Sequence, residues 1–200
     1  MKKFDRLPPE QRKKEIKTAA VRLFIEKGFA ATTMENIVAQ VSLSKGGVYR
    51  IYPSATAILS DLMIDGMHLR NAFYAEKITQ EIQSGRHITT SFLTDMICDS
   101  LLLYPELSSL YVEFLWEKQR NPVLETLYRE IVSTALQETH DLIQTYSTKE
   151  LLETETISLE RLGDLMNVAI LGIKVLGLQD SFEKNKHKIS AFMANALSIL

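Results

Sequence analysis

Apolar residues recur along this chain at intervals of three and four positions, which is the spacing of one buried face on an α-helix. The first such run lies between Pro8 and Gly28 and contains Ile16, Ala19, Ala20, Leu23 and Phe24. Proline is tolerated in a first helical turn and glycine often ends a helix, so we expect this helix to begin near Pro8–Pro9 and to end at Gly28. No stretch shows the sustained alternation of a strand, and the sequence therefore predicts an all-α fold.

Capping residues and apolar spacing predict about eight further helices. Thr33 and Ser44 are good N-caps for two short helices, which are separated by a turn at Val41-Ser42-Leu43, and Pro53 stops the second of them. The polar segment 146–156 is expected to be a loop or a frayed turn. Longer helices are expected at about 54–84, 88–103, 105–120, 121–145, 158–177 and 181–200.

The chain divides near residue 53 into a small helix-turn-helix domain, residues 1–53, and a larger helical domain, residues 54–200. About 50 residues of short helices form a weak core on their own, so we expect the small domain to lean on the helix that starts near residue 54. Residues 1–55 contain 11 Lys and Arg against 5 Asp and Glu, whereas residues 56–200 contain 12 against 20. A basic segment favours a polyanionic partner, and a chance distribution of surface charge is the alternative.

The predicted helix 44–52 has the features of a helix that enters the major groove of DNA. Lys45, Tyr49 and Arg50 can face outward while Val48 and Ile51 face the core. Cationic side chains supply much of the affinity for phosphates, and a short helix in the groove reads sequence. The two adjacent glycines after Lys45 cost about 1 kcal/mol each relative to alanine, which is reasonable where a backbone approaches another surface. The alternative is that these are ordinary solvated residues.

The residues of this region also form a recognisable pattern: Ile16, Ala19, Ala20, Leu23, Phe24, Gly28, Phe29, Thr32, Thr33, Ile37, Leu43, Ser44, Lys45, Gly46, Val48, Tyr49, Tyr52 and Ser54. Over residues 12–59 it resembles the N-terminal signature of the tetracycline-repressor (TetR) family. The resemblance implies a homodimeric repressor that binds operator DNA and is released when a small molecule binds the larger domain. It implies phosphate contacts by Thr33, Ser44, Lys45 and Tyr49 and positions near base edges for Gly47 and Arg50, and Gly46 and Tyr52 complete the predicted DNA-binding set.

Three positions depart from the pattern of this family. Ser42 stands in the turn where glycine is usual, and a left-handed conformation there would cost serine roughly 1 kcal/mol more. Val38 stands where a smaller alanine is common, and Ala55 stands where a lysine often opens the next helix. A helical interaction protein that has lost specific DNA binding is therefore the alternative function.

The last two predicted helices are the candidates for a dimer interface, because their apolar positions cover more than one face: Leu162, Leu165, Met166, Ala169, Ile170, Ile173, Leu176, Ile189, Phe192, Met193, Ala196, Leu197 and Ile199. Four helices from two chains bury such faces well. The alternative is that the core of a single chain needs this width.

An effector pocket needs apolar walls and a few polar anchors. The predicted ligand-binding residues are Phe92, Met96, Tyr111, Glu113, Trp116, Tyr128 and Asn167. They favour an apolar or aromatic small molecule, and a buried Glu113 would favour a cationic or hydrogen-bonding one. The alternative is that the aromatic residues form core and that Glu113 is exposed.

Other functional classes find little support. The chain has no apolar run near 18 residues and Cys98 is its only cysteine, so we expect no membrane span, no internal disulfide and a cytoplasmic protein. It has no Gly-rich phosphate loop and its histidines are scattered, so we expect neither an enzyme nor a cofactor. Asp61, Asp65 and His68 share one helical face and could hold a metal, but a solvated face is commoner and no metal site is expected.

Overall fold

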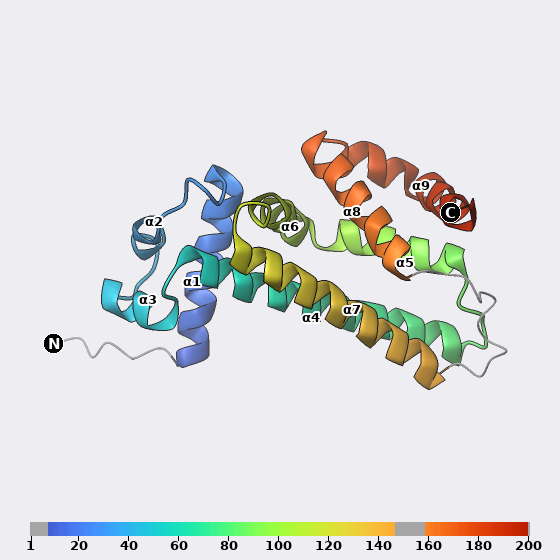
Figure 1. Ribbon diagram of the computed structural model, residues 1–200, viewed down its shortest axis with the longest axis horizontal. Helices are drawn as coiled ribbons and strands as arrows, with labels where there is room; N and C mark the ends of the chain where they lie inside the picture. The colour runs from blue at the N-terminus through green and yellow to red at the C-terminus, as the bar shows by residue number, and fades with distance from the viewer. Residues whose placement is uncertain (1–7, 147–158, 200) are drawn as a thin grey trace. The chain divides into compact units, whose positions relative to one another are not determined.

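The computed structural model describes residues 8–146 and 159–199, and its elements within these ranges are nine α-helices (Figure 1). They are α1 (Pro9–Lys27), α2 (Met34–Val38), α3 (Lys45–Ile51), α4 (Ala55–Gln83), α5 (Thr90–Leu103), α6 (Pro105–Glu117), α7 (Pro122–Tyr146), α8 (Leu159–Val175) and α9 (Gln179–Ile199). The prediction of an all-α fold with a helix-turn-helix followed by a larger helical part is confirmed. The predicted loop at 146–156 lies, apart from the last residue of α7, outside the described residues.

The chain forms two compact units. The first comprises the described residues up to Asp65 together with 109–127, and the second comprises 66–108 with the described residues from Tyr128 onward. α4, α6 and α7 each contribute residues to both units. The division at residue 53 proposed from the sequence stays a prediction.

Helix ends in the first unit are fixed by capping. α1 ends at Gly28, whose φ of 80° is readily adopted by glycine. α2 follows Thr33, whose hydroxyl accepts the Asn36 N–H at 3.2 Å while the Asn36 side chain accepts the Thr33 N–H at 3.1 Å. α3 follows Ser44, whose hydroxyl accepts the Gly47 N–H at 3.2 Å. These bonds satisfy amide groups that a helix N-terminus leaves unpaired, as the capping residues predict.

α1, α2 and α3 enclose a small apolar core, with α1 packed on α2 and α2 on α3. Its fully buried members come from the predicted inward faces and include Ile16, Ala20, Phe24, Ile37 and Val48. Val48 is the buried residue of α3, so it fixes which face of that helix points away from the core.

Ser42 does not adopt the left-handed conformation that would cost serine more than glycine in this turn. Among the described residues, only glycines have positive φ, so Ser42 is not left-handed. Its N–H and hydroxyl groups both donate to the carboxylate of Glu15 on α1, the hydroxyl at 2.9 Å. The turn between α2 and α3 is therefore tied to α1 by a side chain, a solution that does not need glycine.

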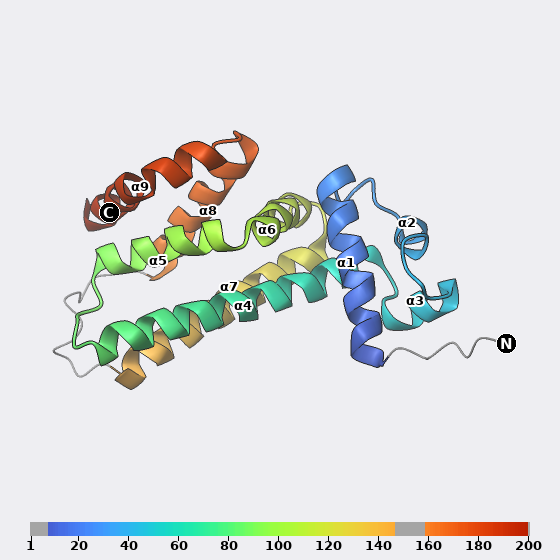
Figure 2. The same cartoon turned by 180° about the vertical axis from the view of Figure 1, so that it is seen from behind.

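In the second unit, α5 packs against α9 and α8, and the three helices lie side by side in both views (Figures 1 and 2). Buried apolar residues of α5 meet those of α8 and α9, among them Leu93, Ile97, Leu101, Ile170 and Met193. The buried hydroxyl groups of Thr94 and Ser190 lie 3.0 Å apart and satisfy one another between α5 and α9.

The same α8–α9 pair and its connection carry large apolar side chains that are exposed in the described part of the chain. They are Val168 and Val175 on α8, Leu176 and Leu178 in the connection, and Phe192 on α9, which is 72% exposed. Leu162, Ile173 and Phe182 are buried within the unit, so the two helices use one side for their own core and leave another open. None of the described helices combines the length and apolarity needed to cross a bilayer.

Candidate functional site

α3 presents its polar face outward. Lys45, Gly46 and Arg50 are exposed, Tyr49 is half-buried, and Val48 anchors the opposite face in the core. Of the other predicted DNA-binding residues, Thr33 and Ser44 are exposed at the caps of α2 and α3. The structure therefore brings this predicted set together on one unit.

The two adjacent glycines of α3 have different surroundings. A Cβ at Gly46 would meet no atom within 4 Å, whereas a Cβ at Gly47 would lie 3.3 Å from the capping hydroxyl of Ser44 and 3.7 Å from Leu43. Gly47 thus leaves room for the cap of its own helix. Packing gives no reason for Gly46, which leaves a bare patch of backbone on the exposed side of α3.

Tyr52 lies differently from the rest of the predicted set. It is only 4% exposed, and its hydroxyl donates to the carboxylate of Asp61 on α4. Burial and this carboxylate raise the pKa of the Tyr52 phenol. A direct contact of its hydroxyl with DNA would require a buried hydrogen bond to break, whereas its present position fixes the end of α3 against α4.

Lys17 on α1 completes this network, since its ammonium group lies 2.8 Å from Asp61 and 2.6 Å from Asp65. Burial alone would lower the pKa of Lys17, but the two carboxylates raise it. Burial opposes ionisation of Asp61, yet Lys17 and Tyr52 hold its pKa below the usual value. Both aspartates considered for a metal are thus paired with the same lysine, and no group of three or more potential ligands gathers in the described part of the chain.

Glu35 on α2 is a residue that the sequence reasoning missed. One of its carboxylate oxygens accepts from the Lys45 ammonium group at 3.0 Å and from the Tyr49 hydroxyl at 3.1 Å. These bonds hold the pKa of Glu35 below its usual value and that of Lys45 above it. The pKa of Tyr49 is raised by desolvation and by Glu35. The spacing of Lys45 and Tyr49 indicates a shared helical face, but the approach of α2 to that face cannot be read from spacing.

Glu113, predicted as a ligand anchor, contacts the helix-turn-helix part of the chain. Its carboxylate accepts the N–H of Phe29 at 3.0 Å, and Phe29 in turn packs on Phe24 with ring centroids 5.2 Å apart. α6 therefore supports the turn that follows α1.

The remaining predicted ligand residues do not form one cluster. Tyr111 and Trp116 belong with Glu113 to the first unit, where Trp116 is 59% exposed. In the second unit, the side-chain amide of Asn167 donates to the hydroxyl of Tyr128 at 3.3 Å, which brings α7 and α8 together. The other two, Phe92 and Met96, lie half-buried and buried on α5.

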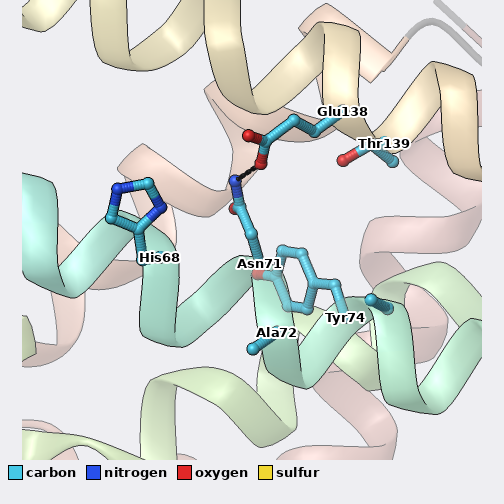
Figure 3. A pocket seen from close by; sticks show the side chains of 7 residues that line it. His68, Asn71, Ala72, Tyr74, Glu138 and Thr139 are labelled. Carbon is cyan, nitrogen blue, oxygen red and sulfur yellow. Dashed lines mark hydrogen bonds between the residues drawn. The ribbon is translucent and has the colours of Figure 1, made fainter.

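The second unit has a hollow of about 290 Å³ between α4 and α7, lined by His68, Asn71, Ala72, Tyr74, Ala75, Glu138 and Thr139 (Figure 3). Asn71 reaches across from α4 to donate to the carboxylate of Glu138 on α7. The hydroxyl of Tyr74 lies 3.0 Å from that of Ser100. None of the predicted ligand residues lines this hollow.

The sequence contained a signal for one wall of the hollow. His68, Asn71, Ala72 and Ala75 recur at spacings of three, one and three, so they share a face of α4, and the two alanines leave space there. The opposite wall could not be found in this way, because Glu138 lies on another helix, 67 positions after Asn71 in the chain.

Comparisons with known proteins agree with this arrangement. A family model described as bacterial regulatory proteins of the tetR family matches residues 16–62. A curated relative, the uncharacterised HTH-type transcriptional regulator YerO of Bacillus subtilis, is 44% identical over 50 residues, which are 25% of this chain and 17% of the relative's length.

Solved structures extend the likeness to the whole fold. A putative TetR-family transcriptional regulator from Mesorhizobium loti has a TM-score of 0.74 at 18% identity, covering 94% of this chain and 95% of its own. GusR of Salmonella enterica has a TM-score of 0.68 at 18% identity with 95% of both chains covered. A putative regulator from Saccharomonospora viridis, solved with choline, has a TM-score of 0.56 at 16% identity over 94% of both chains. At such identities the structures show a shared fold, and residues 16–62 are similar to bacterial regulatory proteins of the tetR family.

Proposed function

We propose that this protein is a transcriptional regulator, acting as a repressor, whose first unit binds operator DNA. The observation that carries the proposal is the outward face of α3, where Lys45 and Arg50 are exposed around the bare backbone of Gly46 while Val48 locks the opposite face into the core. A short cationic helix held rigidly in this way has the form of a helix that enters the major groove.

The roles of the side chains follow from their chemistry. Lys45 and Tyr49 can donate to phosphate oxygens. The hydroxyl oxygens of Thr33 and Ser44 accept hydrogen bonds as the caps of α2 and α3, and their O–H groups can still donate to phosphate. Arg50 can read a guanine edge, and Gly46 and Gly47 let the backbone approach the bases. Tyr52 contributes indirectly by holding the end of α3 through Asp61.

The protein binds DNA as a homodimer, because one short recognition helix reads too few base pairs. The exposed apolar side chains of Val168 on α8, Leu176 just after it and Phe192 on α9 support an interface formed by these two helices. Replacement of Phe192 by Glu should convert a dimer to a monomer in sedimentation analysis, and a wild-type protein that is monomeric at every concentration would contradict this part of the proposal.

A small-molecule effector binds the second unit and weakens DNA binding. The hollow between α4 and α7 supports this, because it combines apolar walls with the carboxylate of Glu138, the amide of Asn71 and the imidazole of His68. Such a set suits an apolar body that carries a cationic or hydrogen-bond-donating group. The neighbouring structure from Saccharomonospora viridis, solved with choline, makes quaternary amines reasonable first probes.

Coupling between the two sites requires that the effector bind two conformations unequally. α4 is a continuous helix that contributes Asp61 to the first unit and His68 and Asn71 to the second. A change at its second half can therefore reach α3 through Asp61 and Tyr52. Effector and operator should oppose each other, and an effector that binds without changing operator affinity would count against this mechanism.

The proposed function is tested by selecting binding sites from random-sequence duplex DNA with the full-length protein. We expect enrichment of a two-fold symmetric site whose halves lie about one helical turn, roughly 34–36 Å, apart. Recovery of no site, together with no binding to any duplex at low ionic strength, would favour a helical interaction protein instead.

A further inference from the structure

Glu35 stands at a point on the proposed DNA-binding face where a negative charge opposes the partner. It is the second residue of α2, and the side chains of Glu35 and Lys45 are 61% and 65% exposed. We propose that Glu35 competes with DNA phosphates for Lys45 and Tyr49, and thereby lowers non-specific affinity and sharpens the discrimination between operator and other DNA. This inference rests on the proposed DNA binding and adds a specificity-determining residue to it.

Glu35 occupies donors that a phosphate would need. A single oxygen of Glu35 accepts both from the Lys45 ammonium group at 3.0 Å and from the Tyr49 hydroxyl at 3.1 Å. Lys45 and Tyr49 are four positions apart on α3, and the ammonium group lies 5.6 Å from the centre of the tyrosine ring. The three groups therefore form one assembly, and both donors are directed at a carboxylate in the place of a phosphate oxygen.

Stability does not account for this assembly. Ion pairs exposed to solvent contribute little to folding, because water screens the charges and the side chains lose freedom. The pair also lies outside the core, which is filled at this point by Val48 and Ile37. An exposed ion pair on a face that has another partner is more readily explained by its effect on that partner.

The negative charge of Glu35 lowers the affinity for DNA of any sequence. When Lys45 binds a phosphate, a cation is released from the DNA, but Glu35 loses its positively charged partner. Glu35 then takes up a cation from solution, and this uptake offsets the release. Where Lys45 stays with Glu35, the carboxylate faces the phosphate backbone. Both routes reduce sequence-independent binding, and they leave readout by Arg50 intact. Because a genome offers very many competing sites, the ratio of specific to non-specific affinity decides occupancy.

The experiment compares wild-type protein with the Glu35→Gln variant on a fluorescent duplex of random sequence, by anisotropy over a range of salt concentrations. Glutamine keeps the size of the side chain and removes its charge. We expect the variant to bind random DNA about tenfold more tightly at low salt. Its slope of log K against log salt should be steeper by about 0.9 for each DNA-binding unit, roughly 1.8 for a dimer. The ratio of operator affinity to random-DNA affinity should fall.

Two controls separate this role from a structural one. Glu130→Gln makes the same charge change at an exposed position of α7 in the second unit, and it should leave affinity and slope unchanged. Introducing Glu35→Gln into protein that already carries Lys45→Gln and Tyr49→Phe should give at most half the gain, because Glu35 acts through these two residues. Melting curves establish that each variant is folded, and Glu35→Asp serves as a second variant that keeps the charge with a shorter reach.

Wild-type protein that binds random DNA as tightly as Glu35→Gln, with the same salt slope, overturns the role of Glu35 and leaves the proposed DNA binding in place. A variant that binds more weakly than wild type also overturns it, since Glu35 would then position Lys45 for DNA. If neither protein binds any duplex at low salt, the proposed function itself fails.

Discussion

Replacement of Tyr52 by Phe is a sharp test of how α3 is held. The change removes only the hydroxyl group, which donates to Asp61, and leaves the buried ring in place. A hydrogen bond to a charged group contributes about 1.5–3 kcal/mol. Because Asp61 keeps Lys17 at 2.8 Å and is partly exposed, we expect the lower end, a loss of about 1.5 kcal/mol in the free energy of unfolding.

The loss is measured by urea unfolding followed by circular dichroism at neutral pH, with Tyr49→Phe as the matched control. Tyr49 also donates to a carboxylate, that of Glu35, but on the exposed face, so its hydroxyl should contribute no measurable stability. Equal stability of wild-type protein and the Tyr52→Phe variant, or equal losses in the two variants, would refute the argument that burial makes the Tyr52 bond the important one.

The same variant carries a pH dependence with a definite sign. Tyr52 and Lys17 hold the pKa of Asp61 below its usual value of 3.8. A group whose pKa is lowered by folding stabilises the folded state above its unfolded pKa, and this contribution disappears as pH falls through the folded pKa. The stability difference between wild-type protein and Tyr52→Phe should therefore be constant at neutral pH and shrink in acid below about pH 3.8. A difference that grows as pH falls would contradict the assignment.

Three further predictions concern the proposed interfaces. Arg50→Ala should weaken operator binding by about 10–100-fold and relax preference at one base pair, whereas Lys45→Ala should weaken binding to all sequences alike; site selection with each variant separates the two. Phe192→Glu should abolish dimerisation in sedimentation analysis, since Phe192 is 72% exposed on α9, and should weaken operator binding more than random-DNA binding. Glu138→Gln should weaken binding of a cationic effector such as choline, measured by calorimetry, while leaving that of a neutral analogue unchanged; equal weakening of both would argue against a charged anchor in the hollow.

Local chemistry made most of the fold predictable. Gly28, Thr33, Ser44 and Pro53 act on the backbone within a few residues of themselves, so the end of α1, the start of α2 and both ends of α3 follow from the residue types alone. The burial of Val48 likewise follows from its spacing on α3. The face of α3 predicted to meet DNA is the face that the structure leaves open.

The contacts that tune this face were not predictable, because each joins residues distant in the sequence. Ser42 would be strained in a left-handed turn, but Glu15 on α1 binds the turn and Ser42 is not left-handed. Glu35 reaches Lys45 only because α2 packs on α3 at one particular angle. Asn71 finds Glu138 only because α4 and α7 lie side by side (Figures 1 and 2). The spacing of residues within a helix predicts which residues share a face. It does not predict which other helix that face will contact.

We propose that α3, presented by a pair of chains, binds duplex DNA. The most direct measurement is the affinity of wild-type protein for a fluorescent duplex as a function of salt concentration. We expect tight binding at low salt and a linear fall of log K with log salt, because cationic side chains displace ions from several phosphates. Binding that is absent at low salt, or that does not respond to salt, would contradict it.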